Sequence, residues 1–254
     1  MANIDVIGGI FLDVYIIQKD NFHNSNILIL PGGSGLNVAV GLSLLGHNVR
    51  LFGNIGNDLA GEIILQKLNL YKVNTNFIQK NKTNTSSFIT FNEKPIAVDR
   101  QTNDLSIEFP KRRSDYLFIT TEVNPNIINS NIYQNYKKVF FDIGPRPSII
   151  TMKFDNVLYI GNYSESKKFI YDCDIVKLGE KGARWGRIIV KSNGIKALYQ
   201  TGMGDVFDTV IINELLENSS KEKSLEKSVN MAQRESNILG ALNKIIDITN
   251  TLKD

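Results

Sequence analysis

Residues 116–143 read YLFITTEVNPNIINSNIYQNYKKVFFDI, and in this stretch two apolar runs flank a helical pattern. The runs Tyr116–Thr120 and Lys138–Ile143 are almost continuously apolar, which is typical of strands covered on both faces. The residues between them, Asn126–Tyr136, have the apolar spacing of a helix. The order strand, helix, strand predicts two parallel strands joined by a crossover helix.

The same alternation continues on either side of this unit. We expect further strands at Ile4–Phe11, Val49–Ile55, Asn156–Gly161, Asp174–Leu178 and Gly186–Val190, and further helices at Leu36–Leu45, Gly61–Leu68 and Ser164–Tyr171. After Asp205 the pattern is wholly helical. The chain is therefore expected to form an α/β fold around a parallel sheet.

Two stretches interrupt the alternation. Val14–Leu30 is a second extended stretch directly after the first strand, and Thr83–Arg100 has the pattern of two strands around a turn. Both indicate β-hairpins outside the main sheet. Such hairpins are either structural additions at the edge of the sheet or a flap over a functional site, and the pattern does not favour one of these two alternatives over the other.

The composition is that of a packed globular protein. The 254 residues are 42% hydrophobic and 22% charged, and their net charge of +3 is too small to mark a nucleic-acid binder. One cysteine, Cys173, and two histidines, His23 and His47, build no zinc site. We find no secretory signal and no apolar stretch near the ~18 residues of a membrane helix. A cytoplasmic protein without membrane or nucleic-acid partners is expected.

A first glycine cluster, PGGSGLNVA at residues 31–39, precedes a helical pattern. Three glycines in four residues let the backbone adopt positive φ angles and let a ligand approach closely. Unpaired N–H groups at the start of the helix, and the positive end of its dipole, face that position. The cluster indicates either a tight strand-to-helix turn or a ligand-binding turn.

A second cluster, TGMGDVF at residues 201–207, places Asp205 in the first turn of the helix that follows. The N–H groups of Gly202, Met203 and Gly204 can form an anion-binding nest in front of the helix dipole. Asp205 is then either a helix cap or a proton acceptor beside a developing negative charge. Phosphoryl transfer requires the second arrangement.

Other common motifs are absent from the sequence. It contains no Gly-x-x-x-x-Gly-Lys-[Ser/Thr] P-loop and no Gly-x-Ser-x-Gly elbow. Gly33-x-Gly35 is followed by Val38 where the dinucleotide-binding fingerprint has its third glycine. Neither a P-loop NTPase nor a nicotinamide-dependent redox enzyme is expected.

Five motifs in this chain resemble those of the ribokinase-like (PfkB) carbohydrate kinases. PGGSGLNVAVGLSLLG at 31–46, continued by VRLFGNIGNDLAGEII at 49–64, resembles the first family signature, and TGMGDVF resembles the second. Between them, FDIGPRP at 141–147 is similar to a sugar-kinase segment, GNYSE at 161–165 to an Asn-x-x-Glu motif, and VKLGEKGA at 176–183 to a Leu-Gly-x-x-Gly turn. The matches are in family order and cover most of the chain.

The resemblance implies a doubly wound α/β domain over residues 1–254, with a small β lid near residues 14–30 and 83–100. It implies an ATP-dependent kinase that phosphorylates a hydroxyl of a sugar, sugar acid or nucleoside. A protruding lid could pair with the lid of a second copy, giving a homodimer. The alternative is a catalytically impaired sugar- or nucleotide-binding or regulatory protein on the same fold.

The family motifs assign roles at the catalytic centre. Asp205 would be the base that takes the proton from the substrate hydroxyl. The amides of Gly202, Met203 and Gly204 would form the anion hole for the transferring phosphoryl group.

The motifs also assign the nucleotide side of the site. Glu165 would organise Mg²⁺ through water, as suits a cation that dehydrates reluctantly. The residues expected along the ATP phosphates are Asn162, Lys177, Gly179, Gly182 and Gly204.

On the substrate side, Asp13, Gly33 and Asn37 would bind sugar hydroxyls. Arg146 would bind an acidic substrate group through two parallel hydrogen bonds, or form a surface ion pair. Glu122, at a strand end, is either a site residue or a solvated loop acid.

The chain departs from the family pattern at the start of the second signature. Tyr199 stands where the family has an acid, in a region that supports a monovalent cation in ribokinase, so the resemblance does not extend potassium activation to this chain. Gln233 and Arg234 lie where an alanine-rich stretch near the adenine is common, so purine recognition is not carried over either.

Overall fold

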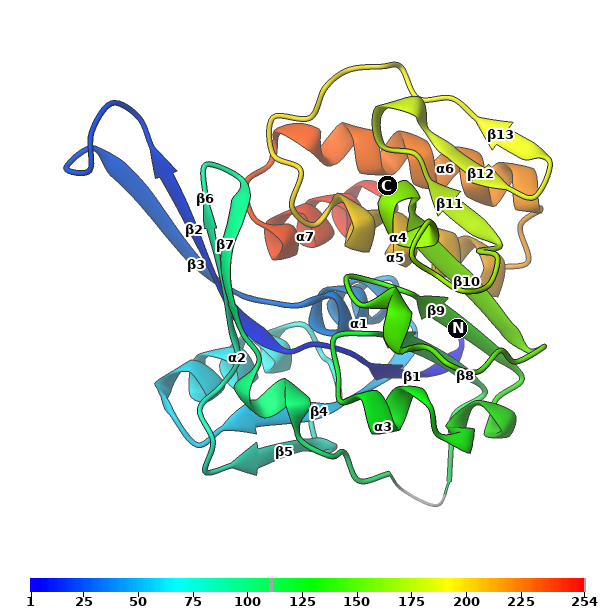
Figure 1. Ribbon diagram of the computed structural model, residues 1–254, viewed down its shortest axis with the longest axis horizontal. Coiled ribbons are helices and arrows are strands. Elements are labelled where there is room, and N and C mark those ends of the chain that lie inside the picture. Colours follow the sequence, from blue (N-terminus) through cyan, green and yellow to red (C-terminus); the bar gives the residue numbers. More distant parts are fainter. Residues whose placement is uncertain (110–111, 254) are drawn as a thin grey trace.

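The computed structural model describes residues 1–109 and 112–253, and a nine-stranded sheet forms the centre of this part of the chain (Figure 1). The spatial order is β13-β12-β11-β10-β9-β8-β1-β4-β5. The strands are β1 (Asn3–Ile7), β4 (Asn48–Gly56), β5 (Ile78–Asn81), β8 (Tyr116–Thr120), β9 (Lys138–Asp142), β10 (Val157–Asn162), β11 (Ile175–Lys177), β12 (Ala183–Trp185) and β13 (Ile188–Val190). Neighbours from β5 to β11 are parallel, and β12 and β13 are antiparallel.

The sheet is doubly wound. From β1 the chain first adds β4 and β5 on one side, and later adds β8, β9, β10 and β11 on the other. Where the order reverses, the carboxyl ends of β1 and β8 open a crevice that α/β proteins use for ligands. The predicted parallel α/β fold is therefore confirmed.

Helices cover both faces of the sheet (Figure 1). The longer ones are α1 (Ser34–Leu44), α2 (Leu59–Leu70), α5 (Met203–Leu216), α6 (Lys221–Arg234) and α7 (Ala241–Thr251), and α3 (Pro125–Ile128) and α4 (Tyr163–Ser166) are single turns. Five 3₁₀ helices occur among the described residues: η1 (Gln101–Asp104), η2 (Asn131–Asn135), η3 (Pro147–Ile149), η4 (Gly179–Lys181) and η5 (Glu235–Asn237).

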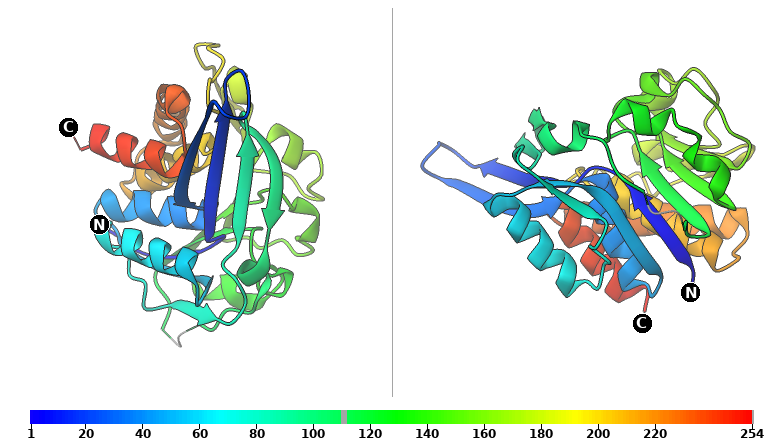
Figure 2. Two further views of the ribbon diagram at one scale, coloured as in Figure 1. Left: turned by 90° about the vertical axis from the view of Figure 1, so that its left-hand side faces the viewer. Right: turned by 90° about the horizontal axis from the view of Figure 1, so that it is seen from below.

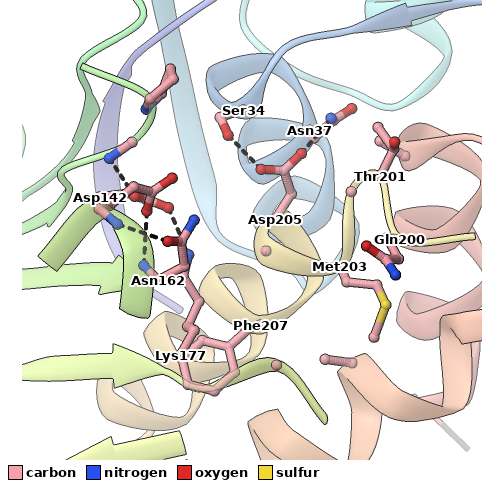
Figure 3. Close-up of a pocket in the computed structure, with 18 of the residues that line it drawn as sticks. Ser34, Asn37, Asp142, Asn162, Lys177, Gln200, Thr201, Met203, Asp205 and Phe207 are labelled. Carbon is pink, nitrogen blue, oxygen red and sulfur yellow. Dashed lines mark hydrogen bonds and ion pairs between the residues drawn. The ribbon is translucent and has the colours of Figure 1, made fainter. Parts of the chain in front are cut away.

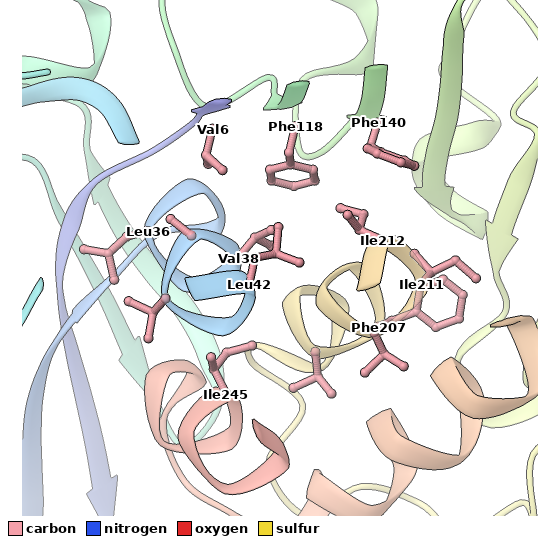
Figure 4. Close-up of a cluster of buried hydrophobic side chains, with 14 of the residues drawn as sticks. Val6, Leu36, Val38, Leu42, Phe118, Phe140, Phe207, Ile211, Ile212 and Ile245 are labelled. Carbon is pink, nitrogen blue, oxygen red and sulfur yellow. The ribbon is translucent and has the colours of Figure 1, made fainter. Parts of the chain in front are cut away.

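The core has two layers because each central strand is buried on both faces. On one face, side chains from β1, β8 and β9 meet α1, α5 and α7: Val6, Phe118, Phe140, Leu36, Val38, Leu42, Phe207, Ile211, Ile212 and Ile245 (Figure 4). Leu117 and Phe141 point to the opposite face and pack with Tyr133 and Tyr159. Burial stabilises each such side chain by roughly 1.5–3 kcal/mol, which explains the continuously apolar strands.

The predicted helix Asn126–Tyr136 is broken in the structure. Only the single turn α3 is α-helical, and the 3₁₀ helix η2 follows it. Between the two, the Asn129 side chain donates to the carbonyl of Ile149 at 2.8 Å and Ser130 Oγ donates to the carbonyl of Ile127 at 2.7 Å. The Ser130 hydroxyl competes for a carbonyl of α3, and the Asn129 side chain ties the end of this turn to Ile149, so the helix does not continue.

Two further predictions need correction. The helix expected at Ser164–Tyr171 is only the turn α4, because the chain then leaves the helix and packs Phe169 against Tyr159, with ring centroids 5.3 Å apart. The strand expected at Gly186–Val190 is the shorter β13, since Gly186 (φ +57°) lies in the turn from β12. β12 and β13 form a hairpin, so this edge is antiparallel.

The two interrupting stretches pair with each other to form a second sheet. β2 (Phe11–Gln18), β3 (Ser25–Gly32), β6 (Ser87–Phe91) and β7 (Lys94–Asp99) have the order β3-β2-β6-β7. The β2–β3 hairpin projects from the rest of the molecule (Figures 1 and 2). The strand predicted at Ile4–Phe11 is divided between the two sheets, since β1 ends at Ile7 and β2 begins at Phe11. We call this four-stranded unit the small sheet.

Within residues 1–109 and 112–253, no helix combines the length and the apolar character needed to cross a membrane.

Candidate active site

A cavity of about 820 Å³ lies between the small sheet, the carboxyl ends of the parallel strands and the start of α5. Its size suits a small-molecule site. All the site residues predicted from the sequence line this cavity: Asp13, Gly33, Asn37, Arg146, Asn162, Glu165, Lys177, Gly179, Gly182, Gly202, Met203, Gly204 and Asp205. Residues from distant parts of the sequence thus meet around one space.

Asp205 is held in place by two side chains from the start of α1. Ser34 Oγ donates to Asp205 Oδ1 at 2.5 Å, and Asn37 Nδ2 donates to Oδ2 at 2.7 Å (Figure 3). The Asp205 residue is only 9% exposed. Burial raises its pKa, while the two hydrogen bonds act in the opposite direction. The result is an oriented carboxylate at the wall of the cavity.

The turn before Asp205 presents backbone amides at the positive end of α5. In the described part of the chain, the amides of Gly202, Gly204 and Asp205 donate to no protein acceptor. The Met203 amide differs from the expectation, because it closes the turn by donating to the carbonyl of Gln200 at 3.2 Å. Unpaired amides in front of a helix dipole form an anion site.

Gly202 is required for the shape of this turn. Its φ angle is +85°, and a Cβ atom there would lie 2.5 Å from Cα of Ala241, the first residue of α7. A larger residue would strain the backbone and push the turn away from α7.

The substrate side of the cavity contains unpaired acceptors. Asp13, on β2, accepts a hydrogen bond from Tyr15 at 2.9 Å through Oδ2. Its Oδ1 atom and Asn37 Oδ1 are buried and have no hydrogen-bond partner among the described residues. Burial raises the pKa of Asp13 to about 7, and the nearby Asp205 adds to this shift. Two such acceptors can each accept a hydrogen bond from a ligand hydroxyl that enters the cavity.

Lys177 lies between two buried carboxylates at the carboxyl end of β11. Its Nζ atom is 2.7 Å from Asp142 Oδ2 (Figure 3). On its other side, the same Nζ atom is 3.1 Å from Asp208 Oδ2. A Cβ atom on Gly204 would lie 3.5 Å from this Nζ, so the ammonium is next to the anion-binding turn. Burial opposes the charge on Lys177, but Asp142 and Asp208 raise its pKa above the ordinary value.

Asn162 and Glu165 form a reciprocal cap at the start of α4. Asn162 Oδ1 accepts a hydrogen bond from the backbone N–H of Glu165 at 2.9 Å, and the backbone N–H of Asn162 donates to Glu165 Oε2 at 2.8 Å. Burial, and then the charge of Asp142, raise the pKa of Glu165 to about 7. The cap holds Glu165 at the cavity and leaves its second oxygen without a protein donor in the described chain.

Two arginines line the substrate side. Arg146 Nε donates to the carbonyl of Thr121 at 2.8 Å, and Arg100 donates to that of Glu122 at 2.5 Å. Both guanidinium groups are near the half-exposed Asp104, at 3.7 Å from Arg146 and 3.2 Å from Arg100. Burial and the charge of Arg100 lower the pKa of Arg146. Two cations thus share one carboxylate partner.

Glu122 belongs to the site and is not a solvated loop acid. Its Oε2 atom accepts the amide of Ser34 at 2.9 Å, and the residue lines the cavity. Burial, and then Asp205, raise its pKa to about 8. The cavity lining also includes apolar side chains, namely Ile195, Ala197, Val229 and Ala232.

Sequence reasoning did not assign a role to several residues that shape the site. Ser34 is inside the first glycine cluster, and its contact with Asp205 depends on how α1 packs against α5. Asp142 lies in the FDIGPRP motif, whereas nothing local in the sequence marks Asp208 or Arg100. A buried acid one helical turn after Asp205 is a weak signal that only tertiary contacts make clear.

The whole fold is similar to solved ribokinases. A ribokinase from Thermotoga maritima superposes with a TM-score of 0.80 at 19% identity, covering all of both chains. An Arabidopsis thaliana ribokinase solved with ribose and ATP gives a TM-score of 0.77 at 17% identity, covering 98% of each chain. The chain therefore has a ribokinase-like fold.

Sequence comparison adds a family match over the first part of the chain. Residues 1–108 match the profile described as pfkB family carbohydrate kinase. The chain is also 22% identical to the 5-dehydro-2-deoxygluconokinase of Mesomycoplasma hyopneumoniae, over 87% of this chain and 81% of that protein. The match over residues 1–108, this relative and the ribokinase-like fold together support a carbohydrate kinase of the pfkB type, which is a phosphotransferase.

Proposed function

We propose that this protein transfers the γ-phosphoryl group of ATP to a hydroxyl of a sugar acid, with Asp205 as the general base. One observation supports this most strongly: a single cavity holds an oriented carboxylate, the unpaired amides of a helix N-terminus and two unpaired buried acceptors. These are the parts needed to deprotonate a polyol hydroxyl next to a phosphoryl group.

Asp205 would take the proton as the hydroxyl oxygen attacks the γ-phosphorus. The O–H bond breaks, the new O–P bond forms, and the bond between the γ-phosphorus and the bridging oxygen breaks to release ADP. Ser34 and Asn37 keep the carboxylate directed at the hydroxyl. Burial makes Asp205 a stronger base than an exposed aspartate because it raises the pKa.

The start of α5 and Lys177 would stabilise the charge on the transferring group. The unpaired amides of Gly202, Gly204 and Asp205 are fixed by the helix, and Lys177 is next to them. In other enzymes, losing one such donor costs about 3–4 kcal/mol of transition-state stabilisation. Asp142 and Asp208 would keep Lys177 charged and directed at the turn.

Magnesium fits the acidic rim beside Lys177. Three acids, Asp142, Asp208 and Glu165, lie around the single ammonium of Lys177. Burial, and then the charge of Asp142, raise the pKa of Glu165, so a bound cation would favour its ionised form. Among the described residues, no group of three or more acidic, histidine or cysteine side chains can hold an ion directly. Glu165 and Asn162 would therefore hold Mg²⁺ through water, where it would neutralise ATP phosphate charge.

The two arginines favour an acidic sugar over a neutral sugar or a nucleoside. Arg100 and Arg146 line the cavity with one carboxylate, Asp104, between them. A carboxylate on the substrate would pair with the remaining guanidinium donors. The relative from Mesomycoplasma is named a 5-dehydro-2-deoxygluconokinase, and that name refers to a derivative of gluconate, which is a sugar acid.

The small sheet would close over the bound sugar. Five residues of this sheet line the cavity and would exclude water from the reacting group: Phe11, Asp13, Phe88, Pro95 and Val98.

We further propose that two copies of the protein pair through the small sheet, because Ile27 and Ile29 on β3 are 63% and 52% exposed. Light scattering would test this, and a monomer at all concentrations would refute it.

A substrate panel tests the proposed function. ADP release would be measured with ATP and Mg²⁺ against 2-keto-3-deoxy acids, gluconate derivatives, neutral pentoses and hexoses, and nucleosides. We expect the highest kcat/KM for a sugar acid, and Arg146→Gln should reduce it selectively, leaving poor neutral acceptors unchanged. A nucleoside as best acceptor would refute the substrate class. Sugar binding without any ADP release would favour the non-catalytic alternative.

A further inference from the structure

Lys244, on α7, is completely buried, and its ammonium group contacts only backbone oxygens at close range. Its Nζ atom donates to the carbonyl of Glu235 at 2.8 Å, to that of Tyr199 at 3.0 Å and to that of Ile238. A neutral amine has two N–H donors, so three acceptors require the charged form. Burial lowers the pKa of Lys244 to about 8, while Glu93 and Glu235 act in the opposite direction.

The three carbonyls come from two separate segments. Tyr199 lies in the loop directly before the anion-binding turn, and Glu235 and Ile238 lie in and just after η5, before α7. The Tyr199 amide also donates to the carbonyl of Ser236 at 2.9 Å. The ammonium therefore ties the loop that leads into the turn to the segment that leads into α7.

The anion-binding turn depends on this connection. Gly202 is in contact with Ala241, the first residue of α7, only a turn away from Lys244. If the loop at Tyr199 moved, Gly202 and the amides after it would lose their fixed position against α7. Preorganised donors contribute to catalysis only when they are held in place before the reaction.

Backbone carbonyls that converge on one point form a site for a monovalent cation. Such rings of oxygens replace the hydration shell of ions such as K⁺, and an ammonium group has the same charge. We propose that Lys244 is a positioning residue whose ammonium replaces a bound monovalent cation, so that the phosphoryl-binding turn stays ordered without added K⁺ or NH₄⁺.

Two substitutions at Lys244 separate this role from simple packing. Lys244→Ala removes the charge and leaves space for an ion, whereas Lys244→Met removes the charge and fills the space. Lys227→Met is the control for the salt response, since it removes a partly exposed lysine of α6 that pairs with Glu214 of α5 and touches none of the three carbonyls. Melting temperature and kcat would be measured in KCl, NH₄Cl and choline chloride at equal ionic strength.

We expect the wild-type protein and Lys227→Met to respond equally to the three salts. Both Lys244 variants should lose about 10- to 100-fold in kcat in choline chloride, as expected when catalytic donors are misplaced. In Lys244→Ala, KCl or NH₄Cl should restore several-fold in kcat and raise the melting temperature, with saturation. Lys244→Met should show no such recovery.

Two results would overturn the inference. One is a folded Lys244→Ala variant without a cation-specific gain in melting temperature. The other is a wild-type protein that is stabilised or activated by K⁺. This second result would contradict the proposed role of Lys244 even if neither variant folds. The kcat measurements rest on the proposed kinase function, whereas the melting temperatures require no activity. Failure of the Lys244 inference can therefore be distinguished from failure of the proposed function.

Discussion

Lys177 Nζ lies 2.7 Å from Asp142 Oδ2, and this ion pair joins the carboxyl ends of β11 and β9 across β10. Asp208, from α5, is on the other side of the ammonium at 3.1 Å. The three residues connect the sheet to the helix whose N-terminus forms the anion site. Burial favours the neutral acids, but the charge of Lys177 lowers the pKa of Asp142, whereas burial raises the pKa of Asp208 well above its usual value.

Replacing Lys177 should impair both catalysis and stability. In Lys177→Met, kcat should fall by about 10²–10³-fold, because one donor near the phosphoryl group is lost. Two buried carboxylates lose their partner, so the free energy of unfolding should fall by about 3–5 kcal/mol. Adding Asp208→Asn to this variant should restore part of the stability and none of the activity.

Urea denaturation and steady-state kinetics would measure these two effects separately. Lys80→Met, which removes an exposed pair with Glu62, is the matched control and should change neither quantity much. Recovery of kcat in the double variant would show that Lys177 acts only through folding stability.

Asp205→Asn should abolish base catalysis and leave the cavity intact. The amide keeps an oxygen for Ser34 Oγ, so the fold should be preserved, while kcat should fall by about 10²–10⁴-fold. Nucleotide affinity, measured by calorimetry, should remain within a few fold. Asp115→Asn, at an exposed ion pair with Lys137, serves as the control. Turnover close to that of the wild type would remove Asp205 from the role of base.

The two glycines of the anion-binding turn should differ in tolerance. A Cβ on Gly202 would lie 2.5 Å from Cα of Ala241 at a φ angle of +85°, whereas a Cβ on Gly204 would meet only Lys177 Nζ, at 3.5 Å. Gly202→Ala should therefore lower the melting temperature and weaken ATP binding, and Gly204→Ala should do much less of both. Equal effects of the two changes would argue against this account of the turn.

The sequence predicts the parts of the fold and site that depend on local patterns. Continuous apolar runs located the parallel strands, and the glycine cluster before Asp205 located the anion-binding turn. Hydrophobic spacing overestimated the crossover helices; after α3, for example, Ser130 binds a helical carbonyl and Asn129 binds the carbonyl of Ile149 instead of continuing the helix. Lys244 was not predicted to matter, since a lysine in a helical stretch is normally exposed. Its three carbonyl partners exist only once α7 packs beside the loop at Tyr199.

Several buried acids should make the ligand-free protein less stable as the pH rises. Burial raises the pKa of Glu122 from 4.5 to about 8 and that of Asp13 from 3.8 to about 7. Between the unfolded and folded values the folded state binds more protons, so stability decreases from about pH 5 to pH 8. The melting temperature should fall by several degrees Celsius over this range, and Glu122→Gln should flatten the fall because the amide does not titrate. Glu62→Gln, on the surface, should leave the slope unchanged. A melting temperature that rises between pH 5 and pH 8 would show that these carboxyl groups are already ionised in the folded cavity.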